Sequence, residues 1–281
     1  MATCVRLTDD YGSYIPCFEK SFFRNLVALI IAVVAFARSA SRSRESKSNS
    51  GIVGCGSRFG GVHLTLMLRS VLGTIGIFAN FYALSHIPIA DGQTLNKTAP
   101  FWTLVFAWMF LGEKVSLRQF AAVAIAFVGA ALVVKPGFAG ADAFPLAMGL
   151  LGGICAGGAY AAVRALGRSG ISPSLIVLVF SGFSCVVSVP LAMTDYVPLT
   201  WMQFLVLMGA GAGAAMGQFG ITLAYRYAAP REIAVFDYTS ILFAAAFGYL
   251  LFGQVSDGFS ILGMLIIIAA AFLLNLHRRA E

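Results

Sequence analysis

Long runs of uncharged residues restrict the possible folds of this chain more than any other feature. Between Arg69 and Asp91 there are 21 uncharged positions, and between Asp195 and Arg226 there are 30. A membrane-spanning helix needs roughly 17–25 apolar residues, and an unpaired ion in hydrocarbon is costly, so these runs predict membrane spans. Of the 281 residues, 59% are hydrophobic and 11% are charged, whereas soluble domains average roughly 45–50% and about 25%. The composition excludes a soluble monomer, a disordered chain and a small secreted scaffold.

The uncharged runs and the positions of the charges between them predict nine spanning helices. The runs are long and continuous, whereas strands of a membrane β-barrel are segments of about ten residues with alternating hydrophobicity. In lipid, every backbone N–H and C=O group needs a hydrogen-bond partner within the protein, which leaves α-helices as the expected spanning structure. The expected fold class is therefore all-α, a polytopic membrane helical bundle, with a polar tail over residues 1–16. The expected helices cover residues 17–37, 63–85, 88–111, 116–135, 144–164, 172–193, 200–224, 230–252 and 257–276.

The distribution of Lys and Arg between the loops predicts the orientation. Alternate loops on one side of the nine spans hold thirteen of these residues, whereas only Lys135 lies in a loop on the opposite side. Cytoplasmic loops are enriched in Lys and Arg. We therefore expect a multi-pass protein of the cytoplasmic (inner) membrane with a cytoplasmic C-terminus and an outer N-terminus. The formal net charge of +7 is then a topology signal and gives no reason to expect a nucleic-acid partner.

A weak internal repeat appears when the sequence is shifted by 141 residues. The shift aligns Asn96 with Asp237 and Thr98 with Thr239, without gaps through two consecutive helices. In the nine-helix count, the helices over 88–111 and 230–252 cross the membrane in opposite directions, which predicts an inverted repeat. The expected units are residues 1–141, with four helices, and residues 142–281, with five. The comparison of the two units predicts that the first unit lacks its first helix, through a shortened sequence, a wrongly assigned start or a variant that works without it.

The stretch YALSHIPIADGQTLNKTAPFWTLVFAWMFLGEKVSLRQFAAVAIAFVGAALVVKPG (82–137) resembles the EamA-like members of the drug/metabolite transporter superfamily. Its most specific element is a helix that ends in Phe110-Leu111-Gly112-Glu113, followed by a polar turn and a second helix. The second copy, GYLLFGQVSDGFSILG (248–263), departs from the pattern because Gln254 stands where an acidic residue is usual. The resemblance implies a secondary transporter of small metabolites built from two inverted five-helix units around a central cavity.

Polar residues inside the predicted spans are the candidates for binding a substrate, because holding an ionisable group in lipid requires a partner or water. Lys97 lies near the middle of the predicted helix over 88–111, and the repeat places Asp237 at an equivalent depth, so we expect the two to face one cavity. The alternative is an ion pair with a purely structural role. Arg69 is a candidate for anion binding, although it could also extend to the cytoplasmic surface. The full candidate set is Lys97, Asp237, Asn96, Gln93, Tyr238, Asn80 and Arg69.

Other polar positions favour structural roles. Asp91, three residues after Pro88, is expected to cap a helix, and Glu113 is expected to belong to a charged cluster at a helix end. Small residues at 149, 153 and 157, and at 209, 213 and 217, are expected to let helices approach closely. No metal or cofactor is expected, because His63, His86 and His277 are dispersed and no nucleotide-binding or hydrolase motif occurs.

The sequence favours a secondary active transporter, an exporter of an amino acid or related compound that works by alternating access. Its expected partners are a small-molecule substrate and the lipid bilayer, with a homodimer left open, and no catalytic residue is expected. One alternative is a membrane-embedded enzyme that acts on a lipid-linked substrate, although no Asp-rich motif supports it. The other alternative is a non-functional truncated paralogue.

Overall fold

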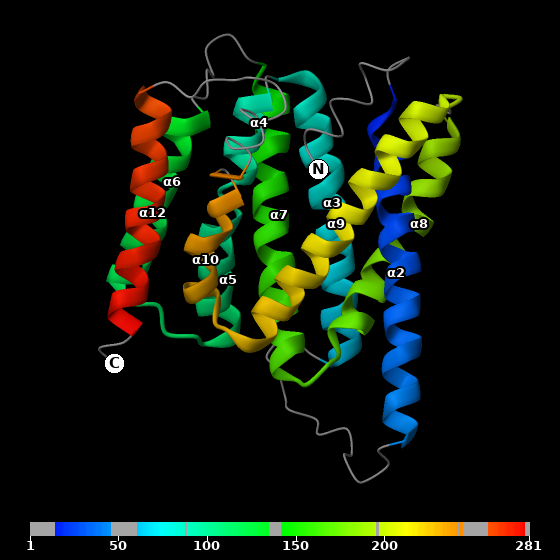
Figure 1. Ribbon diagram of the computed structural model, residues 1–281, viewed down its shortest axis with the longest axis horizontal. Coiled ribbons are helices and arrows are strands. Elements are labelled where there is room, and N and C mark those ends of the chain that lie inside the picture. Colours follow the sequence, from blue (N-terminus) through cyan, green and yellow to red (C-terminus); the bar gives the residue numbers. More distant parts are fainter. Residues whose placement is uncertain are drawn as a thin grey trace. The chain divides into compact units, whose positions relative to one another are not determined.

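The computed structural model describes residues 15–45, 61–87, 89–134, 142–194, 197–240, 242–243 and 258–278. Within these ranges every element of regular structure is a helix, which confirms the predicted fold class (Figure 1). Most of the predicted tail over residues 1–16 lies outside the described residues. The helices are α2 (Cys17–Glu45), α3 (Val62–His86), α4 (Ile89–Asn96), α5 (Ala99–Leu111), α6 (Leu117–Val134), α7 (Ala143–Arg168), α8 (Pro173–Thr194), α9 (Trp201–Tyr227), α10 (Pro230–Asp237) and α12 (Gly258–Arg278).

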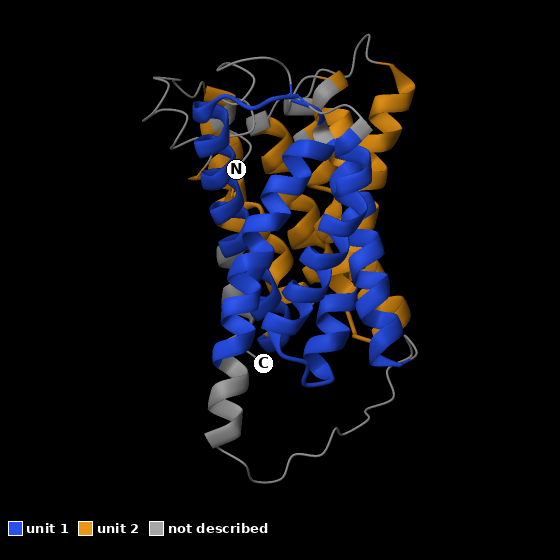
Figure 2. Ribbon diagram, turned by 90° about the vertical axis from the view of Figure 1, so that its right-hand side faces the viewer, with its two compact units in different colours: residues 1–78, 162–227 blue, residues 79–161, 228–281 orange. Residues whose placement is uncertain are grey.

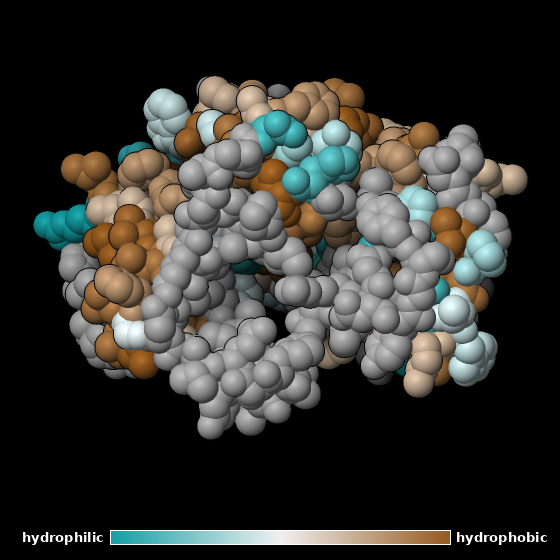
Figure 3. Space-filling view, turned by 90° about the horizontal axis from the view of Figure 1, so that it is seen from above, coloured by the Kyte–Doolittle hydropathy of each residue, from teal (hydrophilic) through white to brown (hydrophobic). Residues whose placement is uncertain are grey.

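Five of the described helices are long and apolar enough to cross a membrane. Their candidate spans are Phe18–Arg38, Val62–Leu84, Ala143–Arg168, Pro173–Met193 and Trp201–Tyr227, and two shorter apolar helices cover Leu117–Leu132 and Ile261–Ala270. Many large apolar side chains of the described residues are exposed, among them Trp108, Leu117 and Met216, and hydrophobic residues are visible on the described surface in Figure 3. Apolar surface of this extent suits lipid rather than water. The chain is a multi-pass membrane protein, and the count of nine spans stays a prediction.

Two of the helix ends show why the helices begin and stop where they do. Gly112 follows α5 in the left-handed conformation, with φ of 65°, which a residue without a Cβ adopts at little cost. At the start of α6, the N–H of Ser116 donates to Oε1 of Gln119, and the N–H of Gln119 donates to Oγ of Ser116. This reciprocal pair is a capping box, which satisfies backbone donors that a helix start leaves without partners.

The chain forms two compact units that alternate along the sequence (Figure 2). Unit 1 comprises residues 1–78 and 162–227, and unit 2 comprises residues 79–161 and 228–281. Helices α3 and α7 each contribute residues to both units. The units are grouped by spatial contact, whereas the predicted division at residue 141 is based on sequence repetition, so that division stays a prediction.

In unit 1, α2 packs against α8 and α9. The buried side of α2 carries Ser21, Asn25, Ala28 and Ala32 at helical spacing, and each is at most 2% exposed. Asn25 Nδ2 donates to Ser184 Oγ of α8 at 2.9 Å, and such interhelical hydrogen bonds help to hold helices together in lipid. The α2–α8 contact therefore depends on small side chains and one polar bridge.

Unit 2 packs α6 against α12, and α10 against α5, α6 and α12. A Cβ built on Gly129 of α6 would lie 2.8 Å from the carbonyl oxygen of Gly263 in α12, so only glycine allows this approach. Tyr238, directly after α10, is fully buried in a core with Val123, Ala126 and Ile267.

The two predicted stripes of small residues have different outcomes. Cβ atoms built on Gly149, Gly153 and Gly157 of α7 would lie within 3 Å of atoms from residues 95–102, which confirms close packing for this stripe. In the described part of the chain, no atom lies within 4 Å of a Cβ built on residues 209, 213 or 217. Close approach at this second stripe stays a prediction. On α9 it is Gly211 that packs tightly, against Val27 of α2.

Candidate functional site

Two interrupted helices form the centre of the candidate site in unit 2. The sequence predicts one continuous helix over 88–111, but the structure ends α4 at Asn96 and starts α5 at Ala99. Thr98 Oγ1 donates to the carbonyl oxygen of Leu95 at 2.7 Å, and Pro100 lacks the N–H that a continuous helix would use. Both features favour a break, because a side-chain donor competes with the helical backbone bond and proline removes a backbone donor.

The second break occurs at the repeat-equivalent position. Helix α10 ends at Asp237, Tyr238 forms a turn, and residues 239–240 are helical again. Thr239 Oγ1 donates to the carbonyl oxygen of Phe236 at 2.6 Å, and Ser240 Oγ donates to that of Asp237 at 2.7 Å. The bounds of α4 and α10 differ by 141 residues, the shift that aligns the sequence with itself. The interruption is therefore present in both copies of the repeat.

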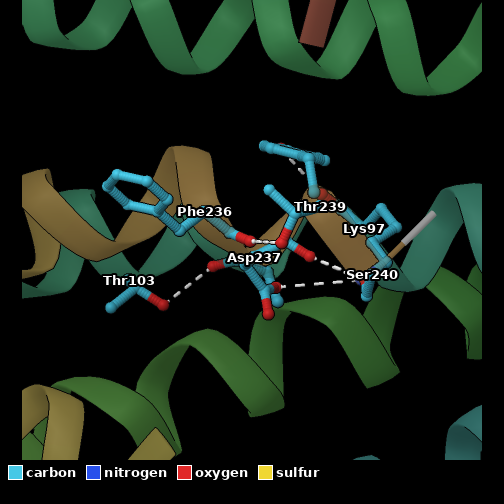
Figure 4. Close-up of polar contacts among 8 residues, drawn as sticks. Lys97, Thr103, Phe236, Asp237, Thr239 and Ser240 are labelled. Atoms are coloured by element: carbon cyan, nitrogen blue, oxygen red, sulfur yellow. Dashed lines mark hydrogen bonds and ion pairs between the residues drawn. The ribbon is translucent and has the colours of Figure 1, made fainter. Parts of the chain in front are cut away.

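The two breaks contact each other through reciprocal hydrogen bonds (Figure 4). Lys97 Nζ donates to Ser240 Oγ at 2.7 Å and to the main-chain carbonyl oxygen of Asp237 at 3.2 Å. In return, the Tyr238 hydroxyl donates to the main-chain carbonyl oxygen of Lys97 at 3.0 Å. Each break thus supplies a side-chain donor to a carbonyl group that the other break leaves outside a regular helix.

The charged groups at the breaks lie close together but are not tightly paired. Lys97 Nζ lies 4.0 Å from Asp237 Oδ2, which is the outer limit for an ion pair, and the two side chains are 16% and 28% exposed. The ammonium group lies at the C-terminal end of α10, where the helix dipole also favours a positive charge. The prediction that Lys97 and Asp237 lie together is consistent with this geometry, whereas their role in binding stays a prediction.

The remaining candidates are distributed over the chain. Asn96 is half-buried at the end of α4, and the side chain of Gln93 lies outside the described residues. The part of α3 that carries Asn80 belongs to unit 2, and Asn80 Oδ1 is buried without a hydrogen-bond partner in the described structure.

Arg69 belongs to unit 1, where it is 2% exposed. Its Nη2 donates to Gln218 Oε1 at 3.0 Å, and its guanidinium carbon lies 4.0 Å from the centre of the Phe180 ring. This burial contradicts the alternative that Arg69 extends to the membrane surface.

Three contact residues were missed by the sequence analysis. Ser240 makes the shortest contact of Lys97, and the pair Thr239-Ser240 directly after Asp237 is a signal that could have revealed it, because such hydroxyls compete with helical backbone bonds. Gln218 and Phe180, the partners of Arg69, lie in apolar runs far along the chain. No local sequence signal identifies those two.

Comparisons with known proteins agree with this architecture. The model of the EamA-like transporter family matches residues 2–135. The pseudopaline exporter of Pseudomonas aeruginosa is 28% identical over 271 residues, which cover 96% of this chain and 89% of that protein. The riboflavin transporter of Vibrio cholerae is 30% identical over 211 residues, covering 74% of this chain and 70% of that protein. A crystal structure with 14% identity matches 98% of this chain and 93% of its own with a TM-score of 0.78, which shows a shared fold.

Proposed function

Because the chain belongs to the EamA-like transporter family, we propose that it is a secondary active transporter that exports a small metabolite, an amino acid or related compound, across the cytoplasmic membrane by alternating access. The family consists of transporters, so membership favours a membrane transporter over the enzyme alternative. The relatives named as transporters of pseudopaline and of riboflavin support a small-molecule substrate. The direction of transport, the substrate class and the use of alternating access are the proposed part.

The pair of interrupted helices is the observation that carries the proposed site. Non-helical backbone at membrane depth is tolerated only where protein or water satisfies its polar groups, and many secondary transporters bind substrates at such breaks. Here each break places a charged side chain, Lys97 or Asp237, beside polar groups of the other break. This arrangement supports a binding site with both signs of charge.

A substrate that carries both a carboxylate and an ammonium group suits this pair. Lys97 Nζ and Asp237 Oδ2 are 4.0 Å apart, whereas charge-assisted hydrogen bonds are typically about 2.7–2.9 Å long. The substrate carboxylate would bind Lys97 and its ammonium group would bind Asp237, so both ions would gain shorter contacts than they make with each other. Asn96, Gln93, Asn80 and Tyr238 are proposed as further polar contacts within unit 2.

Arg69 stays in the proposed set as a separate cation of unit 1. Its guanidinium group is buried against Gln218 and Phe180, which are both neutral side chains. We propose that it binds an anionic substrate group at one stage of the transport cycle.

The proposed orientation places the C-terminus in the cytoplasm. It rests on the Lys and Arg bias between loops and is tested by reporter enzymes fused after residue 281 and within residues 46–60. Both fusions are expected to report a cytoplasmic location, and an outer location for either fusion would contradict the orientation. A homodimer stays open.

Flux through proteoliposomes tests the proposed function. Amino acids are first screened for thermal stabilisation of the purified protein, because a ligand that binds the folded state raises its melting temperature. Radiolabelled forms of the stabilising compounds are then followed across vesicle membranes. Lys97→Ala and Asp237→Ala are expected to abolish flux, whereas Lys114→Ala and Asp142→Asn, which alter exposed side chains, are expected to preserve it.

Two results would contradict this proposal in different ways. Normal flux in both Lys97→Ala and Asp237→Ala would remove the site but keep the transporter. The absence of stabilisation and of flux for every compound would favour the non-functional paralogue.

A measurement of whether water reaches the two breaks distinguishes a substrate-binding site from a structural ion pair. Ser240 is exposed and donates to the carbonyl oxygen at the end of α10. In a cysteine-free background, Ser240→Cys is expected to react with a membrane-impermeant thiol reagent in one orientation of the protein, and its reaction should slow when a substrate binds. Complete protection with and without substrate would indicate that the breaks face lipid or protein only.

A further inference from the structure

A buried carboxylate lies in unit 1, outside the site formed by the two breaks. Glu19 stands in the first turn of α2 and is 1% exposed. Its Oε2 accepts a hydrogen bond from the main-chain N–H of Val197 at 3.4 Å, and its Oε1 is buried without a hydrogen-bond partner. Among the described residues, no basic side chain forms an ion pair with the Glu19 carboxylate.

Such a carboxylate is costly in its charged form. Burial of an unpaired ion is strongly disfavoured, and one long hydrogen bond from a backbone N–H offsets little of that penalty. Protonation removes the charge and supplies an O–H donor. The environment of Glu19 thus suits a group that binds and releases a proton.

The helices packed against α2 offer few groups that could hold the charge of Glu19. Helix α8 contains Cys185 as its only titratable side chain, and those of α9 lie in its last three residues, at the end far from Val197 along the helix. The Phe78 ring of α3 contacts that of Phe18 at 5.1 Å. Besides Glu19, the titratable side chains of these elements are Cys17, Lys20, Arg24, Arg38, Arg42, Arg44 and Glu45 on α2, Cys185 on α8, Tyr225, Arg226 and Tyr227 on α9, and His63 and Arg69 on the unit 1 part of α3, while Asp195 lies outside the described residues.

Buried polar groups continue inward from Glu19 along the contact between α2 and α8. These helices run antiparallel, because Glu19 contacts Val197 beyond the end of α8 and Asn25 contacts Ser184 further inside it (Figure 1). Ser188 lies one turn beyond Ser184, toward the Glu19 end, and Ser181 lies about one turn in the other direction. All three serines are fully buried, and the hydroxyls of Ser181 and Ser188 have no hydrogen-bond partner in the described structure.

We propose that Glu19 is the proton-binding residue that couples transport to the proton gradient, and that the buried hydroxyl and amide groups between α2 and α8 form its proton path. Glu19 takes up a proton from one side of the membrane, becomes neutral, and releases the same proton toward the other side. Serine hydroxyls both donate and accept hydrogen bonds, so they can pass a proton without a net change. This inference rests on the proposed function, because a proton gradient can be coupled to transport only if the protein transports a substrate.

Infrared spectroscopy tests proton binding without a substrate. The purified protein in nanodiscs is titrated with acid and base, and the carbonyl band of a buried carboxylic acid is followed in difference spectra. We expect a titrating band in the wild type and in Asp142→Asn, which changes an exposed acid, and its loss in Glu19→Gln. A band that persists in Glu19→Gln, or the absence of any band in the wild type, would overturn the assignment. Should Glu19→Gln fail to fold, Glu19→Asp should keep the band but shift the pH at which it titrates.

Coupling is measured as an accumulation ratio in proteoliposomes with a mixture of radiolabelled amino acids and no membrane potential. For exchange of one proton per substrate, a gradient of one pH unit should change the steady-state ratio about tenfold. The ratio should stay near this value in Asp142→Asn and fall to one in Glu19→Gln. A sodium gradient that drives accumulation in place of the proton gradient would overturn the proposal. If the wild type carries no amino acid but the infrared band behaves as expected, the proposed function fails while proton binding by Glu19 stands.

Discussion

Addition of one methyl group to α7 should have opposite effects from the same addition to α9. The variants are Gly153→Ala, in the stripe that packs against the α4–α5 break, and Gly213→Ala, in the stripe that has no neighbour among the described residues. A Cβ at residue 153 would collide with Thr98 Oγ1 and lie 2.8 Å from the carbonyl oxygen of Leu95, whereas a Cβ at residue 213 would meet no described atom within 4 Å.

The sizes of the two effects follow from these contacts. Alanine in place of glycine within a helix contributes roughly 0.5–1 kcal/mol, since the unfolded chain loses conformational freedom. Gly213→Ala should therefore raise the free energy of unfolding by about that amount. At residue 153, overpacking costs about 1–3 kcal/mol. The neighbours cannot move freely, because Thr98 Oγ1 already donates to the same Leu95 carbonyl oxygen. We expect Gly153→Ala to lower the free energy of unfolding by about 1 kcal/mol after the helical gain is subtracted.

Steric trapping in bicelles measures the unfolding free energy of both variants beside the wild type. The expected difference between the variants is about 2 kcal/mol, which is the overpacking cost at residue 153, because the helical gain is common to both. Equal stability of Gly153→Ala and Gly213→Ala would refute the reasoning, because it would mean that α7 does not contact the break closely. A loss of stability in Gly213→Ala would instead show that the α9 stripe packs against another helix or a second copy.

Three further predictions concern single hydrogen-bonding groups. Tyr238→Phe removes the donor to the carbonyl oxygen of Lys97 and should lower the free energy of unfolding by about 1–3 kcal/mol; Tyr227→Phe, which alters an exposed ring, should leave it unchanged in the same assay. Asn25→Ala breaks the bridge to α8 and should lower the unfolding free energy by about 0.6–1.7 kcal/mol, with an unchanged melting curve as the contrary result. Gln203→Ala removes the acceptor for the N–H of Thr200 at the start of α9, and hydrogen exchange at residue 200 should become faster, reflecting a loss of about 1 kcal/mol, whereas equal protection would contradict the capping role.

The sequence predicts the helices well because their signal is local. Hydrocarbon excludes charges, so the intervals between charged residues mark the spans, and predicted and observed bounds differ by a few residues for most helices. The exceptions are the predicted helices over 88–111 and 230–252, which the structure interrupts after Asn96 and Asp237, and the predicted helix over 17–37, because α2 continues to Glu45 through a polar stretch. The exclusion of charges from hydrocarbon predicts where a helix leaves the membrane but does not predict where the helix ends in water.

The candidate site is only partly predictable, because its geometry depends on contacts between distant segments. The internal repeat aligns Asn96 with Asp237, and this alignment predicts that Lys97 and Asp237 lie near each other. The break after Asn96 was not predicted, because proline is tolerated inside membrane helices, so Pro100 is compatible with a continuous helix as well as with a break. Glu19 is missed for a different reason. Its burial depends on Val197, which is 178 residues away.

The hydrogen bond from Tyr238 is made to main chain, and this has a practical consequence for genetics at Lys97. Any residue at position 97 presents the same carbonyl oxygen, so the hydroxyl of Tyr238 keeps an anchor even after the ammonium group has been removed. Replacements of Lys97 should therefore yield folded protein with an altered charge. Replacements of Tyr238 should leave the charge of Lys97 in place while removing this hydrogen bond, so stability measurements at the two positions distinguish loss of the charge from loss of the main-chain contact.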